Sequence, residues 1–231
     1  MKSILITGAN RGLGFEFVKQ LTVRENHIFA TCRDPNHAGE LKAWGNKHSN
    51  VSIHQLDVTD DDSIQSLAAE LGGRPLDWLI NNAGISGEEG VTVGNIERNN
   101  FLEVINTNCL GPLKVSELLL PQLRLSQDKL IVCVSSKMGS ISSNERGRSY
   151  AYRTSKAALN CAMRSFAIDV ADLGIQVMLL HPGWVKTDMG GENAPLTSEE
   201  SVKSMLQVIE KNKKDSQAEV LLSYDGSVIH W

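Results

Sequence analysis

The sequence predicts an α/β protein in which a doubly wound, parallel sheet of seven strands carries helices on both faces. Short apolar, β-branched runs alternate along the chain with longer segments of helical periodicity. Several of these runs, such as Ile4–Ile6 and Leu130–Val134, contain no alternating polar residues. This is typical of strands that are buried on both faces of a sheet. Strand–helix–strand repetition with right-handed crossovers then gives the doubly wound arrangement.

Seven strands and five helices are expected along the chain. The expected strands are Ser3–Thr7, His27–Cys32, Val51–Asp57, Trp78–Asn81, Leu130–Ser135, Gln176–His181 and Glu219–Tyr224. The expected helices lie near Gly12–Val23, Asp60–Leu71, Asn108–Leu125, Ala151–Leu173 and Ser198–Lys211. No linker or repeat interrupts this order, so residues 1–231 are expected to form a single domain. Ser140–Ser149 and Met189–Thr197 are rich in loop-forming residues and are expected to be loops beside a functional site.

The composition is that of a globular protein with one core. A chain of 231 residues, 41% of them hydrophobic, is too short for two ordinary domains with linkers. The net charge of −4, without a block of like charge, argues against nucleic acid or an anionic membrane as the main partner. The four cysteines are scattered, so neither disulfides nor a metal site is expected. Without a signal-peptide pattern or a run of about 20 apolar residues, the sequence predicts a cytoplasmic protein.

A glycine-rich turn follows the first expected strand and opens the first expected helix. Glycines let the chain turn sharply and let its backbone approach a pyrophosphate without a Cβ in the way. The helix that follows presents free N–H groups to the phosphates. An ordinary strand-to-helix turn is the alternative, but the strand–turn–helix setting favours a dinucleotide site. The expected cofactor contacts here are Gly8, Asn10, Arg11, Gly12, Leu13 and Gly14.

The spacing G-x-x-x-G-x-G resembles that of the short-chain dehydrogenase/reductase family, and further family motifs follow in order. Residues 81–84 match its N-N-A-G turn, residues 56–58 close the third strand where the family places an Asp against the adenine, and residues 182–183 match its P-G motif. The resemblance implies a Rossmann-type fold, with Thr187 placed to bond the nicotinamide carboxamide. The cofactor contacts that it implies are Asp57, Val58, Asn82, Ala83, Gly84, Pro182, Gly183, Val185 and Thr187.

The end of the second strand bears on the choice between NAD(H) and NADP(H). Rossmann sites that prefer NAD carry an acidic residue at this position, and here that acid is missing near Cys32. Arg33 follows directly, and together with Arg11 it can pair with a 2′-phosphate. The alternative is that Arg33 is a solvated surface residue whose charge is reduced by Asp34. The sequence favours NADP(H).

Tyr152 and Lys156 fit the Y-x-x-x-K motif of the family. On a helix, residues four positions apart share one face and lie about 6 Å apart along the axis. Carbonyl reduction needs a proton on oxygen, and a free tyrosine with a pKa of about 10 exchanges that proton poorly at neutral pH. A nearby cation is expected to lower that pKa. We therefore expect Tyr152 to supply the proton and Lys156 to assist it, both in contact with the cofactor.

Two further polar residues complete the catalytic site that the resemblance implies. The family's double-serine pattern makes Ser136 the residue that holds the substrate carbonyl, with Ser135 as the alternative. Asn108 matches the family's N-x-x-G, where the Asn holds a water that links the lysine to solvent. A helix-capping Asn is its alternative interpretation. His181 is expected to be a packed residue at a strand end.

These motifs together imply an NADP(H)-dependent oxidoreductase that reduces an aldehyde or a ketone to an alcohol, or catalyses the reverse reaction. The segments around residues 150–156 and 181–191 look like those of sniffer-type carbonyl reductases and C-factor-like proteins. Because that group includes signalling proteins, a cofactor-binding signalling or redox-sensing protein with little turnover is the alternative. Epimerase or dehydratase chemistry on a sugar nucleotide is disfavoured, since only 44 residues follow Thr187.

Substrate and oligomeric state are inferred from the same resemblance. A small carbonyl or alcohol substrate is expected beside the loop near residues 188–198. Trp184, Met189 and Met138 either line an apolar pocket there or pack in the core. A homodimer or a homotetramer is expected.

Overall fold

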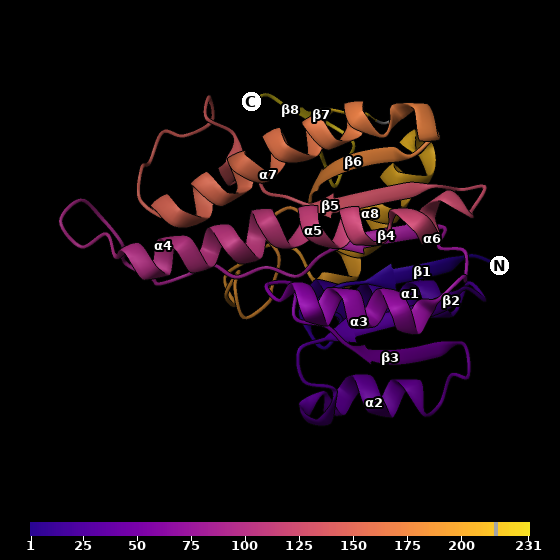
Figure 1. Cartoon of the computed structure of the whole chain (residues 1–231). Coiled ribbons are helices and arrows are strands. Elements are labelled where there is room, and N and C mark those ends of the chain that lie inside the picture. The colour runs from indigo at the N-terminus through magenta and orange to yellow at the C-terminus, as the bar shows by residue number, and fades with distance from the viewer. Residues whose placement is uncertain (215–216) are drawn as a thin grey trace.

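The strands form one sheet in a computed structural model that describes residues 1–214 and 217–231. The spatial order within this sheet is β3-β2-β1-β4-β5-β6-β7-β8 (Figure 1). The strands are β1 (Ser3–Ile6), β2 (His27–Cys32), β3 (Val51–Gln55), β4 (Trp78–Asn81), β5 (Leu130–Val134), β6 (Gln176–His181), β7 (Gln217–Ser223) and β8 (Val228–Ile229). The seven expected strands are present and run parallel. The sheet has an eighth strand that was not expected, the two-residue β8, which pairs antiparallel with β7.

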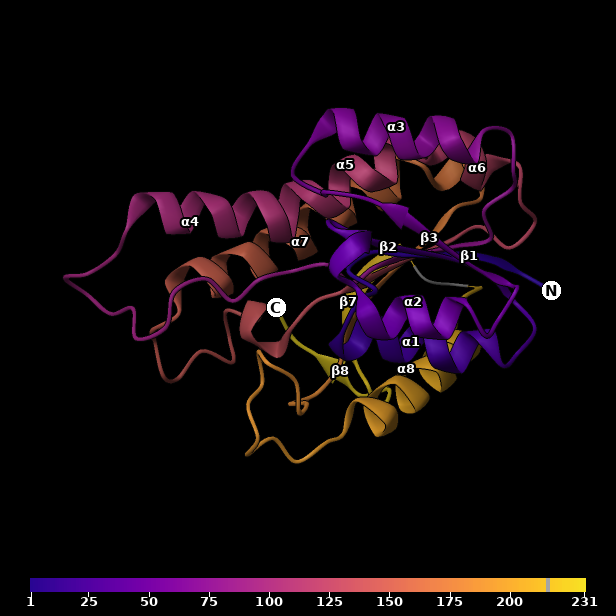
Figure 2. The same ribbon diagram turned by 90° about the horizontal axis from the view of Figure 1, so that it is seen from below.

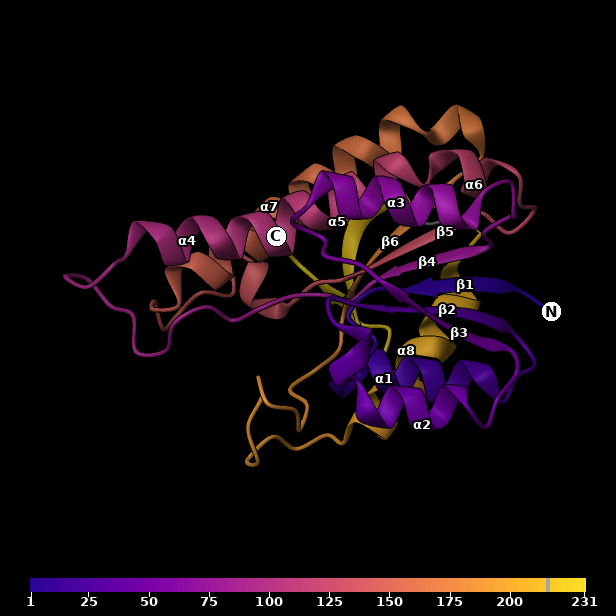
Figure 3. The ribbon, with the colours of Figure 1, turned by 60° about the horizontal axis from the view of Figure 1, so that its bottom comes forward.

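Helices cover both faces of the sheet, which confirms the doubly wound class. They are α1 (Gly12–Thr22), α2 (Gly39–Gly45), α3 (Asp61–Leu71), α4 (Arg98–Ile105), α5 (Gly111–Leu118), α6 (Leu120–Arg124), α7 (Tyr150–Asp169) and α8 (Ser198–Asn212). Short helical turns lie at η1 (Pro35–His37), η2 (Asn106–Leu110), η3 (Lys137–Gly139) and η4 (Ala171–Leu173). Helices α1, α2 and α8 lie on one face, and α3, α5, α6 and α7 lie on the other (Figures 2 and 3).

The inner strands β1, β4 and β5 are largely apolar because each of them supplies both cores. In β1, Ile4 and Ile6 pack in the core that contains Phe17 of α1 and Met205 of α8. The intervening residue Leu5 packs in the opposite core, beneath α3, α5 and α7. Neighbouring residues of a strand point to opposite faces, so burial on both sides requires an unbroken apolar run.

The helix before β5 starts earlier than the sequence predicted. We expected a helix over Asn108–Leu125, whereas α4 begins at Arg98 and leads through the π-helical turn η2 into α5 and α6. Asn108 therefore lies inside a helical stretch, and the helix-capping interpretation of this residue is wrong. The first turns of α4 were missed because its only buried residue is Val104, which leaves no apolar periodicity to detect.

The candidate functional site lies at the carboxyl edge of the sheet. Parallel strands end at one edge, and the loops that follow β1, β4, β5 and β6 gather there. Helix α4 and the first turns of α7 extend beyond this edge (Figures 1 and 2). Among the residues that the structure describes, no helix has both the length and the apolar character needed to cross a bilayer.

Candidate active site

The glycine turn after β1 is held by the turn after β4. The Thr7 hydroxyl oxygen accepts hydrogen bonds from the backbone N–H groups of Asn82 (3.0 Å) and Ala83 (2.9 Å). In return, Asn82 Nδ2 donates to the carbonyl oxygens of Thr7 (2.9 Å) and Gly8 (3.1 Å). The two turns with cofactor-binding patterns are therefore one structural unit. Thr7 was missed as a site residue because its role depends on a contact 75 residues away.

Two glycines of the turn are required by close approach. Gly8 has φ +64°, and a Cβ there would lie 2.9 Å from Ala83 Cα. A Cβ on Gly14 would lie 2.1 Å from the carbonyl oxygen of Gly8. Such contacts exclude any side chain at either position.

The N-terminus of α1 is open to an anion. Its N-cap residue, Arg11, is extended and makes no side-chain capping bond, and the first turn contains no acidic residue. The first N–H groups of a helix have no partner within the helix, and they carry a partial positive charge. The residues at this turn thus fit the pyrophosphate of a dinucleotide.

The end of β2 leaves Arg33 as an exposed cation. Asp34 does not pair with it, because the Asp34 carboxylate accepts hydrogen bonds from Asn36 N (2.9 Å) and His37 Nδ1 (2.5 Å). The hydrogen bond from His37 is the main cause that lowers the pKa of Asp34. In the part of the chain that the structure describes, no carboxylate forms an ion pair with Arg33. No carboxylate among the described residues therefore competes with the expected 2′-phosphate for the Arg33 guanidinium.

Arg11, the second expected partner of a 2′-phosphate, has an acidic partner in this structure. Its guanidinium forms an ion pair with Asp188, which lies in the loop after β6. Both side chains are largely exposed, and solvent weakens such a pair. Arg11 thus has an acidic partner, whereas Arg33 has none among the described residues.

Helix α7 places Tyr152 and Lys156 on one face, as the four-residue spacing predicted. Lys156 is buried, and its Nζ donates to the carbonyl oxygen of Val134 (2.9 Å) at the end of β5. The same Nζ lies 5.8 Å from the centroid of the Tyr152 ring. Burial lowers the pKa of Lys156 to about 8. The ammonium is thus close to the ring and still largely protonated at pH 7.

The pKa of Tyr152 is raised, whereas the sequence led us to expect a lowered value. We expected Lys156 to lower it, whereas burial raises it, and only a hydrogen bond with Ser136 opposes the increase. The reason is that loss of solvent penalises the phenolate more than the surroundings stabilise it. A raised pKa keeps the phenol protonated, which is the form that donates a proton.

The two serines after β5 have different surroundings. Ser136 Oγ accepts a hydrogen bond from Met138 N (3.1 Å), and its hydroxyl lies within hydrogen-bonding reach of Tyr152. Ser135 is buried, and its Oγ donates to Asn160 Oδ1 (2.6 Å) within the protein. Only Ser136 therefore lies beside the Tyr152 hydroxyl, and Ser135 has a structural partner instead.

Asn108 connects the turn after β4 to α7. Its Oδ1 accepts from Ile85 N (2.8 Å), while its Nδ2 donates to Ile85 O (2.8 Å) and to Ser155 Oγ (3.0 Å). A Cβ on Gly84 would lie 3.1 Å from Asn108 Oδ1 and 3.7 Å from Lys156 Nζ. Asn108 and the Lys156 ammonium therefore both lie beside Gly84. The water link remains a prediction.

Two positioning residues near Lys156 were missed from the sequence. Ser155 donates to the carbonyl oxygen of Tyr152 (2.8 Å) and accepts from Asn108, so it joins two site residues. Gly139 packs η3 directly on α7, since a Cβ there would lie 2.7 Å from the carbonyl carbon of Lys156. Their signals are weak, because a serine within a helix and a glycine in a loop are common.

The loop after β6 reaches the glycine turn. Gly183 has φ +85°, and a Cβ there would lie 2.5 Å from Leu196 Cδ1. Pro182 O accepts a hydrogen bond from Ser201 Oγ (2.7 Å) of α8. Thr187 Cγ2 lies 3.5 Å from the position of a Cβ on Gly12. Pro182, Gly183 and Thr187 are therefore held against the same carboxyl edge.

The apolar residues of this region divide into two groups. Val185 is buried, and it pairs with Leu196 through an isolated bridge. Trp184 and Met189 are 56% and 48% exposed, so packing in the core is excluded for both. Met138 is half-buried. The exposed pair fits the expectation of an apolar surface beside the site.

The turn after β3 is built around Asp57. Its Oδ1 accepts from Thr59 N (2.9 Å) and Thr59 Oγ1 (2.7 Å). Val58 is buried beneath Gly111, where a Cβ would lie 2.9 Å from Val58 Cγ2. The glycine of N-x-x-G thus lets α5 pack on this turn.

Known proteins match both the sequence and the fold. The family model described as short chain dehydrogenase matches residues 2–197. C-signal of Myxococcus xanthus is 40% identical over 168 residues, covering 73% of this chain and all of that protein. Carbonyl reductase Sniffer of D. melanogaster is 35% identical with a TM-score of 0.91, covering both chains in full. The NADPH-bound carbonyl reductase from chicken fatty liver is 40% identical with a TM-score of 0.92, covering 100% of this chain and 99% of that one. The chain therefore belongs to the short-chain dehydrogenase/reductase family and is an oxidoreductase.

Proposed function

We propose that this protein uses NADPH to reduce an aldehyde or a ketone to an alcohol. The observation that carries the proposal is the juxtaposition of the Tyr152 phenol with the Ser136 hydroxyl and the Lys156 ammonium. This group lies at the carboxyl edge of the sheet, where the glycine turn is also placed. The solved relatives from chicken and from Burkholderia multivorans are described with NADPH and NADP bound, respectively.

Each side chain of the site has a separate role in the transfer of the proton. When bound, the nicotinamide supplies a hydride to the carbonyl carbon. The Ser136 hydroxyl donates a hydrogen bond to the carbonyl oxygen, and the Tyr152 phenol gives its proton to the same oxygen. Lys156, whose pKa is lowered to about 8, is still mostly protonated at pH 7, and its charge stabilises the phenolate that remains. Asn108 joins the turn after β4, through Ile85, to α7, through Ser155.

Replacing Tyr152→Phe tests this assignment. We expect turnover of a carbonyl panel to fall by at least about 10²-fold, since the variant lacks the proton donor. NADPH binding, measured by fluorescence, should stay within a few-fold of the wild-type value. Tyr150→Phe is the matched control, because Tyr150 begins α7 outside the four-residue spacing to Lys156. Near wild-type reduction by Tyr152→Phe would refute the mechanism.

A preference for NADPH over NADH is part of the same proposal. It is supported by the exposed Arg33 guanidinium, which no carboxylate in the described residues neutralises. Arg33→Gln should weaken NADPH binding by about tenfold or more, the value of one charge-assisted hydrogen bond, and should leave NADH binding nearly unchanged. Lys42→Gln, the same loss of charge on α2, should change neither. A higher kcat/KM with NADH in the wild type would overturn this preference.

The likeness to C-signal favours one alternative, a cofactor-binding signalling protein with little turnover. Asn108, Ser136, Tyr152 and Lys156 are all present, which supports the enzymatic proposal over this one. A broad carbonyl panel with NADPH oxidation as the readout separates the two. We propose that the substrate is a small molecule that lies near residues 188–198, where Trp184 and Met189 are exposed.

A further inference from the structure

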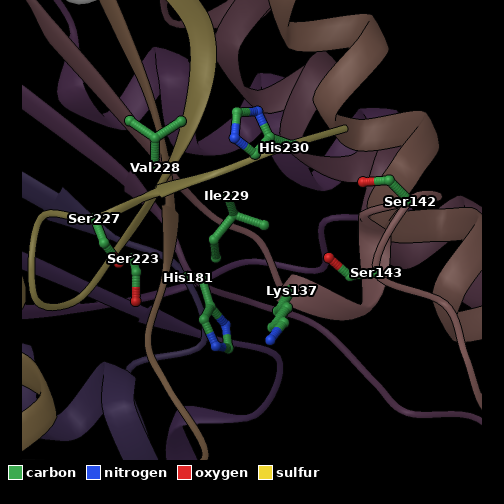
Figure 4. Close-up of a pocket in the computed structure, with 9 residues that line it drawn as sticks. All are labelled: Lys137, Ser142, Ser143, His181, Ser223, Ser227, Val228, Ile229 and His230. Atoms are coloured by element: carbon green, nitrogen blue, oxygen red, sulfur yellow. The ribbon is translucent and has the colours of Figure 1, made fainter.

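A cavity lies at the carboxyl ends of β6 and β7. It has a volume of about 340 Å³ and is bounded by the ends of β6 and β7, by β8 and by the segment after β5 (Figure 4). This volume falls within the range of small-ligand sites, about 300–1,000 Å³. None of the residues that line it is acidic. Its polar lining includes Lys137, His181, His230 and the hydroxyl groups of Ser142, Ser143 and Ser227.

His181, one of the residues that line this cavity, carries an unsatisfied polar atom. It is the last residue of β6, and its backbone is fixed by pairing with Ser223. Its Nδ1 is buried and has no hydrogen-bond partner among the described residues. A buried polar atom without a partner is destabilising, and an unseen water, ion or ligand is one explanation for such an atom in a native protein.

Lys137 adds a positive charge that the fold does not neutralise. Its side chain extends toward the His181 ring (Figure 4). No acid in the described residues forms an ion pair with it. Burial, and next the charge of Lys137, lowers the pKa of His181 to about 4, so the ring is neutral at pH 7.

Asp225 is the acid whose charge acts on His181, and it only partly offsets these effects. It lies in the turn between β7 and β8. Its Oδ1 accepts hydrogen bonds from Ser227 N (3.0 Å) and Ser227 Oγ (2.6 Å), and these lower the pKa of Asp225. The Asp225 carboxylate is thus hydrogen-bonded within its own turn, and Lys137 is the charged side chain among the residues that line the cavity.

The serine-rich segment is fixed against the residues that follow β8. Ser140 Oγ donates to the carbonyl oxygen of His230 (2.5 Å) and accepts from Ser143 N (3.2 Å). Ser142 N donates to the backbone oxygen of Trp231 (3.1 Å). These bonds hold the hydroxyl groups and the imidazole of His230 at the border of the cavity.

We propose that this cavity binds the oxyanion of a small ligand, a carboxylate or a phosphate group. Lys137 supplies the charge, and His181 together with the serine hydroxyls supplies hydrogen-bond donors. The proposal goes beyond carbonyl reduction and does not depend on it. Lys137 follows Ser136 and His181 precedes Pro182, so the cavity lies close to the candidate active site. The oxyanion therefore belongs either to a free effector or to the carbonyl substrate itself.

Inorganic phosphate is the probe, titrated into the full chain at constant ionic strength. We expect a saturable shift of the His181 imidazole resonance in NMR, assigned with His181→Asn. The pKa of His181 should rise from about 4 in bound protein, because an adjacent anion stabilises the imidazolium. Lys137→Gln should weaken binding about tenfold, and Lys137→Arg should retain it. Lys203→Gln, the same loss of charge on the exposed side of α8, should have less than about a twofold effect.

The proposal would be refuted if phosphate caused no saturable shift. It would also be refuted if Lys203→Gln weakened phosphate binding as much as Lys137→Gln does. Because this titration needs no turnover, its failure is distinct from failure of the proposed reductase activity. A second experiment distinguishes a free anion from an oxyanion on the substrate. It compares kcat/KM for a keto acid with kcat/KM for the corresponding primary amide. If the substrate carries the oxyanion, Lys137→Gln lowers kcat/KM for the acid alone and phosphate competes with it. If a free anion is bound, the variant affects both ketones alike.

Discussion

The paired substitutions Ser135→Ala and Ser136→Ala separate structural from chemical roles at adjacent positions. Ser135 donates to Asn160 Oδ1 at 2.6 Å, and both residues are buried. Asn160 Nδ2 already lacks a partner among the described residues. Loss of the Ser135 hydroxyl leaves the Oδ1 unsatisfied as well, which should lower the free energy of unfolding by about 1–3 kcal/mol. In a chain of this size each kcal/mol lowers Tm by about 2–4 °C.

Ser136→Ala should show the opposite pattern. Its Oγ accepts one hydrogen bond, from Met138 N, so the loss of stability is about 1 kcal/mol. If its hydroxyl donates to the carbonyl oxygen in the transition state, kcat should fall by about 10²–10³-fold. Urea denaturation and NADPH oxidation, measured on both variants, give the two readouts. Loss of turnover in Ser135→Ala with near wild-type turnover in Ser136→Ala would refute the assignment.

Two other perturbations follow from the same contacts. Gly14→Ala should abolish tight NADPH binding, measured by fluorescence or calorimetry, because its Cβ would lie 2.1 Å from Gly8 O; binding within a few-fold of wild type would contradict the tight-turn argument. His181 has a folded-state pKa of about 4 against an ordinary 6.5, so the unfolded chain binds more protons between these values and stability falls as pH decreases through them. Relative to His181→Asn, wild type should therefore lose about 3 kcal/mol between pH 6.5 and 4 in urea titrations, and equal pH profiles would argue against a buried, neutral imidazole.

The sequence predicts the strands better than it predicts the helices around the site. The runs that form β1, β4 and β5 are apolar on both faces, and this pattern identifies them without knowledge of their neighbours. Helix α2 was missed because it is short, starts and ends with glycine, and buries only Leu41. The β8 strand has two residues, and it exists because β7 offers a free edge. Such elements are determined by tertiary contacts that leave no periodic signal.

Motif spacing predicted which residues gather at the site, and the structure adds how each is held. The spacing of Tyr152 and Lys156 specifies one helix face, but the burial that raises the pKa of Tyr152 comes from the rest of the fold. The choice between Ser135 and Ser136 likewise depended on Asn160, 25 residues away from Ser135. The expected homodimer or homotetramer remains a prediction, which sedimentation velocity would test.

The strand order of the sheet has a consequence for how the chain is assembled during synthesis. β1 lies between β2 and β4, and Ser3 N donates to Asp77 Oδ2 at 2.7 Å. When only β1, β2 and β3 have left the ribosome, one edge of β1 has no neighbour until β4 emerges. Parallel pairings across such long separations form slowly and expose unpaired strand edges. Nascent chains that stop before residue 78 should therefore expose the edge of β1, and the glycine turn can take its final shape only after Asn82 has been made.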